Sequence, residues 1–538
     1  MEFDVLTVPA EGAEAALFGQ CTVHRQQNPF ASAVLPGTAP WVLVLAQGLA
    51  PAAGFFTAAK QGIAARPAAA GFALRCVPGG GVGYIDPVSL EAQRFCGGAA
   101  LLRRTAVEEV GGFDAALPPP AALYDLALRL RGAGGALYYL PRAVLHSTGQ
   151  QAGDEGLGPY VDAARGELLL AYKYGGVPAA NRRYFATLKN PQHYPGVRRA
   201  LAGGWVRHLG RLWGRLAWRW GHAALRRAAG ALRAQDFALD PGPEAPVMQA
   251  EGDLPAISVV VRTHARPARL RCTLQSLANQ THQNFEVVVV EDGAPTAQTM
   301  VEQEFSHLPV RYIATGENVG RGKAGNIGLA AAKGPYLNLL DDDDYFYPEH
   351  LETMAALAAA HPAADLLTTS SVSMEVDVES EVPYRHVVRR MVPIEIDRMD
   401  VFTMCQTCQV HVAGVVFKKS LFEACGGLDE ALPAHEDWAM WLRFFAKGKR
   451  ANPTGVDTKR ITTVFVQPAD EAEARRRMQQ YMQADETFFG DESIRFDVSL
   501  GDMRRFYDGV IADMRHVQAL GKLDDFLDAQ ARRGEERP

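Results

Sequence analysis

The chain has 538 residues, which is more than one hydrophobic core accommodates and indicates two to four domains. Hydrophobic residues make up 48% of it and charged residues 22%, as in ordinary globular proteins, and a net charge of −6 argues against bulk affinity for nucleic acid. Residues 1–20 lack the features of a signal peptide, and no stretch reaches the roughly 18–20 apolar residues of a membrane-spanning helix. Seven cysteines, an odd number, do not suggest a disulfide framework, so we expect a cytoplasmic protein with reduced thiols.

The first 155 residues contain a segment that recurs later in the chain. Residues 98–117, GAALLRRTAVEEVGGFDAAL, align with residues 413–432, AGVVFKKSLFEACGGLDEAL. The two segments have small residues, two adjacent basic residues, Gly-Gly, an aspartate and a final Ala-Leu at equivalent positions. Two copies of one structural unit explain this repeat most simply.

The second shared segment differs in its acids. Residues 40–51, PWVLVLAQGLAP, match residues 335–346, PYLNLLDDDDYF, but Ala46 to Leu49 stand where the later copy has four aspartates. We therefore expect residues 1–155 to form a degenerate, non-catalytic module. His146, which has no acidic partners in this copy, is expected to be structural.

Residues 156–234 are expected to be helical, and residues 203–233 to form a basic amphipathic helix. Arginines recur there every four residues among tryptophans and leucines, and no acid interrupts them. Such a helix could lie on an anionic membrane surface, or it could pack between domains with its arginines solvated. Residues 235–254 are rich in proline, glycine and acids and are expected to be a linker.

Strand and helix patterns alternate after the linker. The β-branched runs at 257–261 and 285–290 flank a segment at 267–280 with leucines at helical spacing. A third strand is predicted at 310–314, and a fourth, YLNLL, at 336–340. This alternation predicts an α/β domain with an open, doubly wound parallel sheet over residues 255–465.

Four consecutive aspartates, Asp341 to Asp344, follow the fourth strand. Ligands of open α/β sheets bind at the carboxyl ends of the strands. Mg²⁺ and Mn²⁺ prefer oxygen ligands, and a bound divalent cation would relieve the repulsion among adjacent carboxylates. The alternative is a solvated acidic turn.

Two further segments carry candidate ligand-binding residues. The second strand ends in Glu291 and Asp292 before Gly293, which suits a contact to a base or a ribose. The glycine-rich stretch ENVGRGKAGNIG at 317–328 enters a helix and carries Arg321 and Lys323, which could face phosphates. Such a loop alone is weak support for phosphate binding.

The combination of these motifs resembles the family 2 glycosyltransferases, which have the GT-A fold. The likeness runs from Ile257 to about Lys449, and its segments occur in the family's order: VVEDGAP, NVGRGKAGN, LLDDDDYFYP and CGGLDEALPAHEDWAMWLRF. It implies a nucleotide-sugar donor and a Mn²⁺ or Mg²⁺ ion. The first module resembles the acceptor half of the same fold.

The resemblance also implies roles for individual residues. Asp341 and Asp343 would be the D-x-D pair that contacts ribose and binds the metal and the diphosphate, and Asp344 would add to the metal site. Glu436 and Asp437 would hold the acceptor, with Asp437 as general base. The residues expected to bind the donor are Thr263, Arg266, Asp292, Arg321, Lys323, Asn326, Asp341 and Asp342.

One base and no covalent intermediate imply inversion at the anomeric carbon. The acceptor would be a glycan or a lipid-linked sugar, with a role in bacterial surface polysaccharide synthesis. The sequence departs from the family at Ala324-Gly325-Asn326, where members often have Ala-Arg-Asn, so Arg321 or Lys323 would have to substitute. The metal-binding histidine that many members have downstream of the base is also missing.

Other interpretations remain open. A nucleotidyltransferase also places acids and a metal on an α/β sheet, but it would normally carry glycines directly after the first strand. A glycan-binding scaffold is the non-enzymatic alternative. Cys405 and Cys408 have zinc-like spacing without a second pair, so two small residues near the acceptor cleft are the simpler reading. Residues 466–538 are expected to be helical and either to cap that cleft or to mediate self-association.

Overall fold

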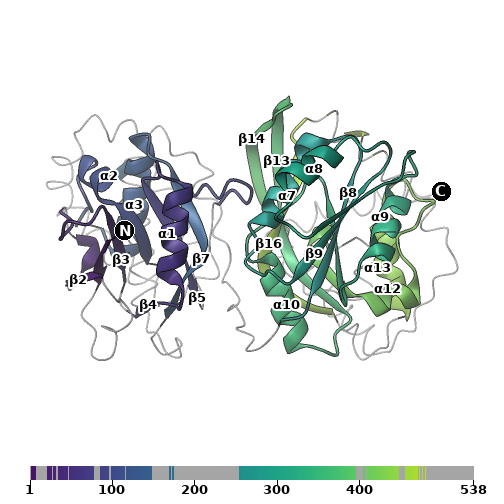
Figure 1. Cartoon of the computed structure of the whole chain (residues 1–538), viewed down its shortest axis with the longest axis horizontal. Helices are drawn as coiled ribbons and strands as arrows, with labels where there is room; N and C mark the ends of the chain where they lie inside the picture. Colours follow the sequence, from purple (N-terminus) through teal and green to yellow (C-terminus); the bar gives the residue numbers. More distant parts are fainter. Residues whose placement is uncertain are drawn as a thin grey trace, which may run out of the picture. The chain divides into compact units, whose positions relative to one another are not determined.

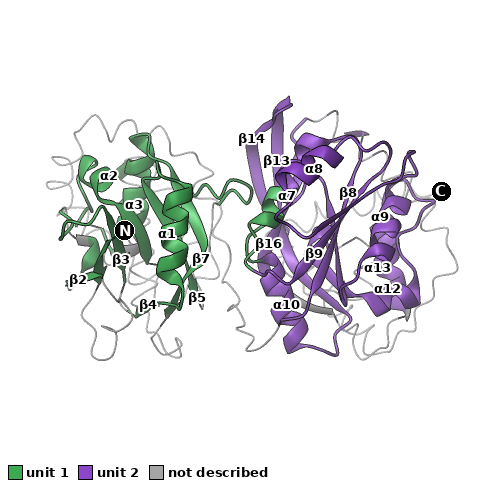
Figure 2. Cartoon of the chain, in the orientation of Figure 1, with its two compact units in different colours: residues 1–249, 275–281, 347–349 green, residues 250–274, 282–346, 350–538 purple. Residues whose placement is uncertain are grey.

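The computed structural model describes residues 2–147, 169–174, 254–394, 404–447 and 455–479, with gaps inside some of these ranges, the longest over 8–20. It divides into two compact units (Figure 2). Unit 1 comprises residues 1–249, 275–281 and 347–349, and unit 2 comprises 250–274, 282–346 and 350–538. The predicted basic helix, nearly all of the linker and most of the C-terminal helical region lie outside the described residues, and they stay predictions.

Unit 1 is built on a mixed sheet with the strand order β2-β1-β3-β6-β5-β7-β4 in its described part (Figure 1). Its strands are β1 (Phe3–Thr7), β2 (Thr22–Arg25), β3 (Trp41–Leu45), β4 (Leu49–Pro51), β5 (Gly71–Val77), β6 (Ala99–Arg103) and β7 (Leu137–Ser147). Its α-helices are α1 (Phe55–Ala65), α2 (Arg104–Glu109) and α3 (Pro119–Gly132).

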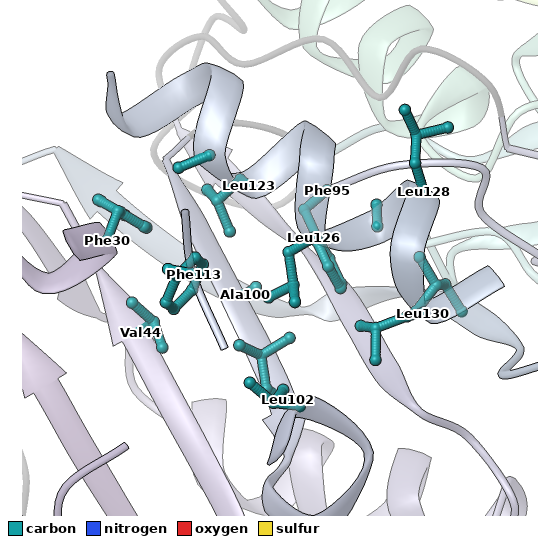
Figure 3. Packing of buried hydrophobic residues seen from close by; sticks show 14 of the residues in the cluster. Phe30, Val44, Phe95, Ala100, Leu102, Phe113, Leu123, Leu126, Leu128 and Leu130 are labelled. Atoms are coloured by element: carbon teal, nitrogen blue, oxygen red, sulfur yellow. The ribbon is translucent and has the colours of Figure 1, made fainter. Parts of the chain in front are cut away.

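Both faces of this sheet are covered. All five residues of β3, WVLVL, are buried. Because successive side chains of a strand point to opposite faces, Val42 and Val44 join one hydrophobic cluster, with α3, and Leu43 and Leu45 join another, with α1. Figure 3 shows the α3 cluster, in which leucines of the helix lie over β6. A strand buried on both faces explains the unbroken apolar run in the sequence.

Unit 2 contains a larger mixed sheet, with the order β10-β9-β8-β11-β15-β13-β16-β12 and with β14 beside β13. Its strands are β8 (Ile257–Thr263), β9 (Phe285–Glu291), β10 (Val310–Ala314), β11 (Tyr336–Asp341), β12 (Tyr345–Phe346), β13 (Leu366–Glu381), β14 (Tyr384–Ile394), β15 (Val415–Lys418) and β16 (Gly455–Pro468). Its helices are α7 (Pro267–Ala278), α8 (Gln298–Glu304), α9 (Arg321–Ala331), α10 (His350–Ala360), α12 (Lys419–Cys425) and α13 (Glu436–Lys447).

The predicted parallel strands are confirmed, and the sheet continues beyond them in mixed directions. β10, β9, β8 and β11 are parallel neighbours. β15 runs antiparallel to both β11 and β13, a reversal that the β/α alternation did not indicate. Residues of α9, α12 and α13 share one hydrophobic cluster with alternate residues of β8, β9 and β11, so these helices cover one face of the sheet (Figure 1).

The two sheets share a topology. In unit 1, β2, β1 and β3 are parallel, β6 is antiparallel to β3 and β5, β5 is parallel to β7, and β4 is antiparallel to β7. In unit 2, β9, β8, β11, β15, β13, β16 and β12 repeat this order and these directions strand for strand. Among the described strands, β10 and β14 are additions of unit 2. The shared topology agrees with the repeat in the sequence.

Helix α9 lies unusually close to the sheet. Gly322, Gly325 and Gly328 recur every third residue and therefore occupy one side of the helix. A Cβ at Gly328 would lie 2.2 Å from Val260 Cγ1, and one at Gly322 would lie 2.8 Å from the carbonyl oxygen of Asp429. The glycines thus let α9 pack closely against β8, β9 and the loop before α13.

Candidate functional site

Acidic side chains from three separate segments meet at one edge of the unit 2 sheet. Asp341 ends β11, Asp292 follows β9, and Glu436 begins α13. Parallel strands bring their carboxyl ends to a common edge, which explains how residues far apart in the sequence converge. A cleft of about 300 Å³ opens at this edge. It is lined by Arg262, Thr263, His264, Arg266, Asp292, Arg321, Ala324, Asp341, Asp343, Asp344, Ala434, Phe465 and Val466.

Two arginines and two carboxylates form a closed ion-pair ring at the base of the cleft. Arg262 donates from Nε and Nη2 to Asp341 Oδ1 at 2.9 and 2.6 Å, and from Nη1 to Glu436 Oε1 at 2.8 Å. Arg321 lies with Nε 2.8 Å from Glu436 Oε1 and Nη2 3.5 Å from Asp341 Oδ2. The arginines thus balance the two carboxylates, one from a strand end and one from a helix start.

Burial and charge act in opposite directions within this ring. Burial favours the neutral form of Asp341, but the charges of Arg262 and Arg321 outweigh it and hold the pKa of Asp341 well below its usual range. Burial likewise works against the charge of Arg262, yet Asp341 and Glu436 raise its pKa. Both partners therefore stay ionised at neutral pH.

Asp342 and Asp343 share the guanidinium of Arg266. Asp342 is fully buried, accepts a hydrogen bond from Thr263 Oγ1 at 2.6 Å and pairs with Arg266. Arg266 Nη1 also lies 2.9 Å from Asp343 Oδ2, and Arg269 Nη1 lies 3.4 Å from the same oxygen. Burial raises the pKa of Asp342 to about 7, because Arg266 offsets only part of it and Asp343 adds negative charge.

Asp344 is buried next to a histidine. Its Oδ1 accepts the Val466 amide hydrogen bond at 2.9 Å, and His411 Nε2 lies 3.5 Å from its Oδ2. Burial and the charges of Asp343 and Asp341 raise the pKa of Asp344 well above its usual range. Burial also lowers the pKa of His411 to about 4, so this ring is neutral at pH 7.

The acids could bind a divalent cation if phosphate groups of a substrate completed its coordination. Among the described residues, no three His, Cys, Asp or Glu side chains form a closed metal site. Asp343 and Asp344 nevertheless line the cleft as adjacent hard oxygen donors, and burial next to other acids disfavours the charge of Asp344. A cation would relieve that repulsion. Mg²⁺ is commonly held by one or two carboxylates together with substrate phosphates, so the donor set fits such an ion.

Asp292 organises the glycine-rich loop. Its carboxylate accepts hydrogen bonds from the backbone N–H groups of Val319 at 2.6 Å and Gly320 at 3.0 Å. Gly320 has a φ of +92°, a conformation that favours glycine and turns the chain into α9. Asp292 therefore fixes the loop and also lines the cleft, and its predicted contact to base or ribose stays a prediction.

The predicted base, Asp437, lies in the first turn of α13. Burial and the neighbouring charge of Glu436 raise the pKa of Asp437 to about 6, although Arg321 and Arg262 act in the opposite direction. His435, just before the helix, has a φ of +62°, which is strained for a residue with a side chain. An elevated pKa near neutrality suits a group that takes up a proton.

Three of the predicted donor residues lie away from the lining of the cleft: the fully buried Asp342, Lys323 and Asn326. Lys323 is exposed on α9, one position beyond the buried Gly322. Asn326 donates from Nδ2 to Leu428 O at 3.0 Å and to Glu430 Oε1 at 2.9 Å, and its Oδ1 accepts the Leu428 N–H at 2.8 Å. Asn326 thus ties α9 to the loop before α13.

Several residues of the site were not predicted, among them Arg262, Arg269 and His411. Arg262 was hidden in the strand run ISVVVRT, where a charge after buried valines is the signal that could have found it. Arg269 follows Arg266 by one helical turn. His411 is distant in the sequence from Glu436 and Asp437, so no local motif marks it, and only the fold places it next to Asp344.

The paired cysteines have ordinary surroundings. Cys408 Sγ donates to the Val410 carbonyl at 3.2 Å, and burial, followed by the charge of Asp437, raises the pKa of its thiol. Cys405 packs partly buried against the core. In the part of the chain that the structure describes, neither cysteine belongs to a metal cluster, and no helix is long and apolar enough to cross a membrane.

Comparisons with known proteins find glycosyltransferases. The family model described as glycosyl transferase family 2 matches residues 258–424. An uncharacterized glycosyltransferase of Haemophilus influenzae is 29% identical over 187 residues, which are 35% of this chain and 61% of that protein. The uncharacterized glycosyltransferase YwdF of Bacillus subtilis is 27% identical over 188 residues, 35% of this chain and 67% of that protein. The matches thus span about two thirds of these relatives.

One solved structure illustrates the likeness in three dimensions. The mannosyltransferase PcManGT from Pyrobaculum calidifontis, in complex with GDP-Man and Mn²⁺, is 16% identical. The superposition covers 57% of this chain and 86% of that one, with a TM-score of 0.36.

Proposed function

We propose, from the premise that residues 258–424 belong to glycosyl transferase family 2, that unit 2 transfers a sugar from a nucleotide-sugar donor to a glycan or lipid-linked acceptor. Family membership and the GT-A fold were both predicted from the motifs, and the family match confirms them. The donor, the acceptor and the stereochemistry belong to the proposal.

The convergence of acids from three segments at one cleft supports this proposal most strongly. A nucleotidyltransferase or a solvated acidic turn would not require Asp292, the four aspartates and Glu436 to share an edge with the buried Arg262 and the exposed Arg321. In the proposed arrangement Asp292 holds the loop beside the nucleoside, and Asp341 and Asp343 face the ribose and the diphosphate, while the buried Asp342 holds Arg266. Glu436 and Asp437 face the acceptor.

Asp437 would act as the general base. A sugar hydroxyl becomes a better nucleophile when a nearby carboxylate takes its proton in the transition state. With one base on the acceptor side and no covalent intermediate, displacement inverts the anomeric carbon. The half-buried position of Asp437 keeps its proton affinity close to the working pH, which is the condition for efficient proton transfer.

Asp343 and Asp344 would hold Mn²⁺ or Mg²⁺ together with the diphosphate of the donor. Such an ion supplies positive charge where the leaving diphosphate gains negative charge. Arg266 and Arg269, which pair with Asp343, would then be free to contact phosphate oxygens. We further propose that the enzyme takes part in bacterial surface polysaccharide synthesis and that residues 203–233 bind the membrane surface.

Donor binding can be tested by thermal shift with UDP-, GDP-, dTDP- and CMP-sugars in the presence of Mn²⁺. A ligand present at 100 times its Kd stabilises the folded state by about 2.7 kcal/mol, which raises the Tm by several degrees. We expect one class of nucleotide sugar to give this rise in the wild type and to lose it in Asp343→Asn. Absence of a shift with all four classes would contradict the proposal.

A further inference from the structure

A missing side chain on α9 makes room for an arginine from β8. The family resemblance predicts an arginine in the loop at position 325, where this chain has Gly325. A Cβ built on Gly325 would lie 2.3 Å from Leu428 Cδ1 and 3.1 Å from Arg262 Cδ. A side chain at 325 would therefore meet the side chains of both Leu428 and Arg262.

We propose that Arg262 is a positioning residue: it holds the carboxylates of Asp341 and Glu436 in one fixed arrangement, and from β8 it takes the place of a loop arginine at position 325. This inference rests on the proposed function, since Asp341 belongs there to the donor side and Glu436 to the acceptor side. The glycine at 325 then leaves room for Arg262 as well as for Leu428.

The geometry distinguishes Arg262 from the other arginines of the cleft. Its side chain is 6% exposed, against 41% for Arg266 and 49% for Arg321, so it acts through the carboxylates that it binds. Its three hydrogen bonds use both sides of the guanidinium, two to Asp341 and one to Glu436. A planar fork can bridge two carboxylates in this way, whereas the single ammonium of lysine cannot reproduce the same set of bonds.

The consequence concerns alignment between donor and acceptor. Asp341 and Glu436 come from β11 and α13, and Arg262 is bonded to both. Loss of this bridge would leave Glu436 paired with the exposed Arg321 and would let the start of α13, with Asp437, shift relative to the strand end. Misplacement of reacting groups by about 1 Å can cost on the order of 100-fold in rate.

The test compares turnover of UDP-, GDP-, dTDP- and CMP-sugars with Mn²⁺ in four variants of the full chain. They are Arg262→Met, Arg262→Lys, the double variant Arg262→Met/Gly325→Arg, and Arg271→Met as the matched control. Arg271 pairs with Glu304 on the surface, outside the cleft. Circular dichroism and Tm show whether each variant is folded.

We expect Arg262→Met to lower kcat on the order of 100-fold with little change in the donor KM. Arg262→Lys should also lower kcat, but by a smaller factor. The double variant should regain about tenfold or more, because its arginine enters the same space from α9 and Leu428 can move aside. Arg271→Met should match the wild type.

Two results would overturn the inference while leaving the proposed function intact. One is a folded Arg262→Met, or a folded Arg262→Lys if the methionine variant does not fold, with kcat within about twofold of the wild type. The other is a folded double variant no more active than Arg262→Met. A wild type that turns over none of the nucleotide sugars would instead refute the proposed function, and this inference with it.

Discussion

At the scale of single residues, the site separates carboxylates by their surroundings. Asp341 is held ionised by Arg262 and Arg321, whereas burial and neighbouring acids raise the pKa of Asp344 and of Asp437. Adjacent residues of identical chemistry are thus given different proton affinities by what they contact. Each of the four consecutive aspartates has a different environment. Asp341, Asp343 and Asp344 line the cleft, whereas Asp342 does not.

Asp437 sets a pH dependence if it is the base. A carboxylate accepts a proton only when ionised, and the pKa of Asp437 is raised to about 6. Below that pH the neutral acid predominates, so kcat/KM should rise with pH through about 6 and level off above it. Asp437→Asn should lower the rate by 100-fold or more and abolish the rise. A pH profile of the wild type that is flat between pH 5 and 8 would argue against this role.

At the scale of elements, a buried polar network joins β11 to α10 and β16. His350 Nε2 lies 3.0 Å from Asn338 Oδ1, and His350 Nδ1 lies 2.8 Å from Thr462 Oγ1. Asn338 donates to the carbonyls of Ala413 and Val415, at the start of β15. The strand that carries the aspartates is therefore anchored on both sides by hydrogen bonds that only a neutral histidine and a correctly placed amide complete.

Burial lowers the pKa of His350 to about 3, which makes the network sensitive to acid. Because the unfolded chain binds a proton at its ordinary pKa near 6.5, this histidine's contribution to stability is complete above that pH and declines as the pH falls toward 3. The loss should be about 2 kcal/mol between pH 7 and pH 5. Urea unfolding at both pH values should show a smaller difference in His350→Gln than in the wild type; equal differences would contradict the assignment.

The close contact of α9 with β8 predicts a steric effect. Gly328→Ala would bring a methyl group against Val260 Cγ1 and Val290 Cγ2, in a packed core. Overpacking should cost about 1–3 kcal/mol of unfolding free energy, which outweighs the helix propensity gained from alanine. The double variant Gly328→Ala/Val260→Ala should show a favourable coupling energy, because the second change removes the clash. Additive losses would mean that α9 shifts away from the sheet instead.

The individual strands and helices could be predicted from local sequence patterns, whereas the pairing of the strands in the sheet could be predicted only in part. The strands at 257–261, 285–290, 310–314 and 336–340 and the helix at 267–280 follow from β-branched runs and leucine spacing. The antiparallel β15 between β11 and β13 did not, because direction is set by connections and not by a strand's own residues. The acids at the strand ends could be found because the strands themselves were recognised from local sequence. The roles of Arg262, Arg269 and His411, in contrast, depend on contacts between segments that are distant in the sequence.

At the scale of the whole molecule, the described residues form two sheets of one topology, and the acidic cleft described above lies in unit 2. Unit 1 repeats the strand order of unit 2 through β4, the counterpart of β12. A buried ion pair lies at the opposite edge of the unit 1 sheet, at the amino ends of β1 and β3: Arg104 binds Asp4 at 2.5 Å and the carbonyls of Ala39 and Leu35 at 2.7 Å. At the carboxyl end of β3, the counterpart of β11, the sequence has Ala46 to Leu49 in place of the four aspartates, which supports the proposal that unit 1 is a degenerate module.

The proposed separation of roles can be checked with Arg104→Met. Leaving Asp4 buried without its arginine should cost about 3–5 kcal/mol of unfolding free energy in unit 1. Because the proposed active site lies in unit 2, turnover below the melting range should match the wild type. A folded variant that has lost turnover would show that unit 1 takes part in the reaction.

The central claim is that the cleft at Asp292, Asp341–Asp344 and Glu436 transfers sugar from a nucleotide donor. Its most direct test is the release of nucleoside phosphate from nucleotide sugars with Mn²⁺, in the wild type, in Asp343→Asn and in the surface control Arg271→Met. We predict turnover by the wild type and the control, and a loss of 100-fold or more in Asp343→Asn. Equal rates in all three proteins, or no release by the wild type with any donor, would contradict the claim.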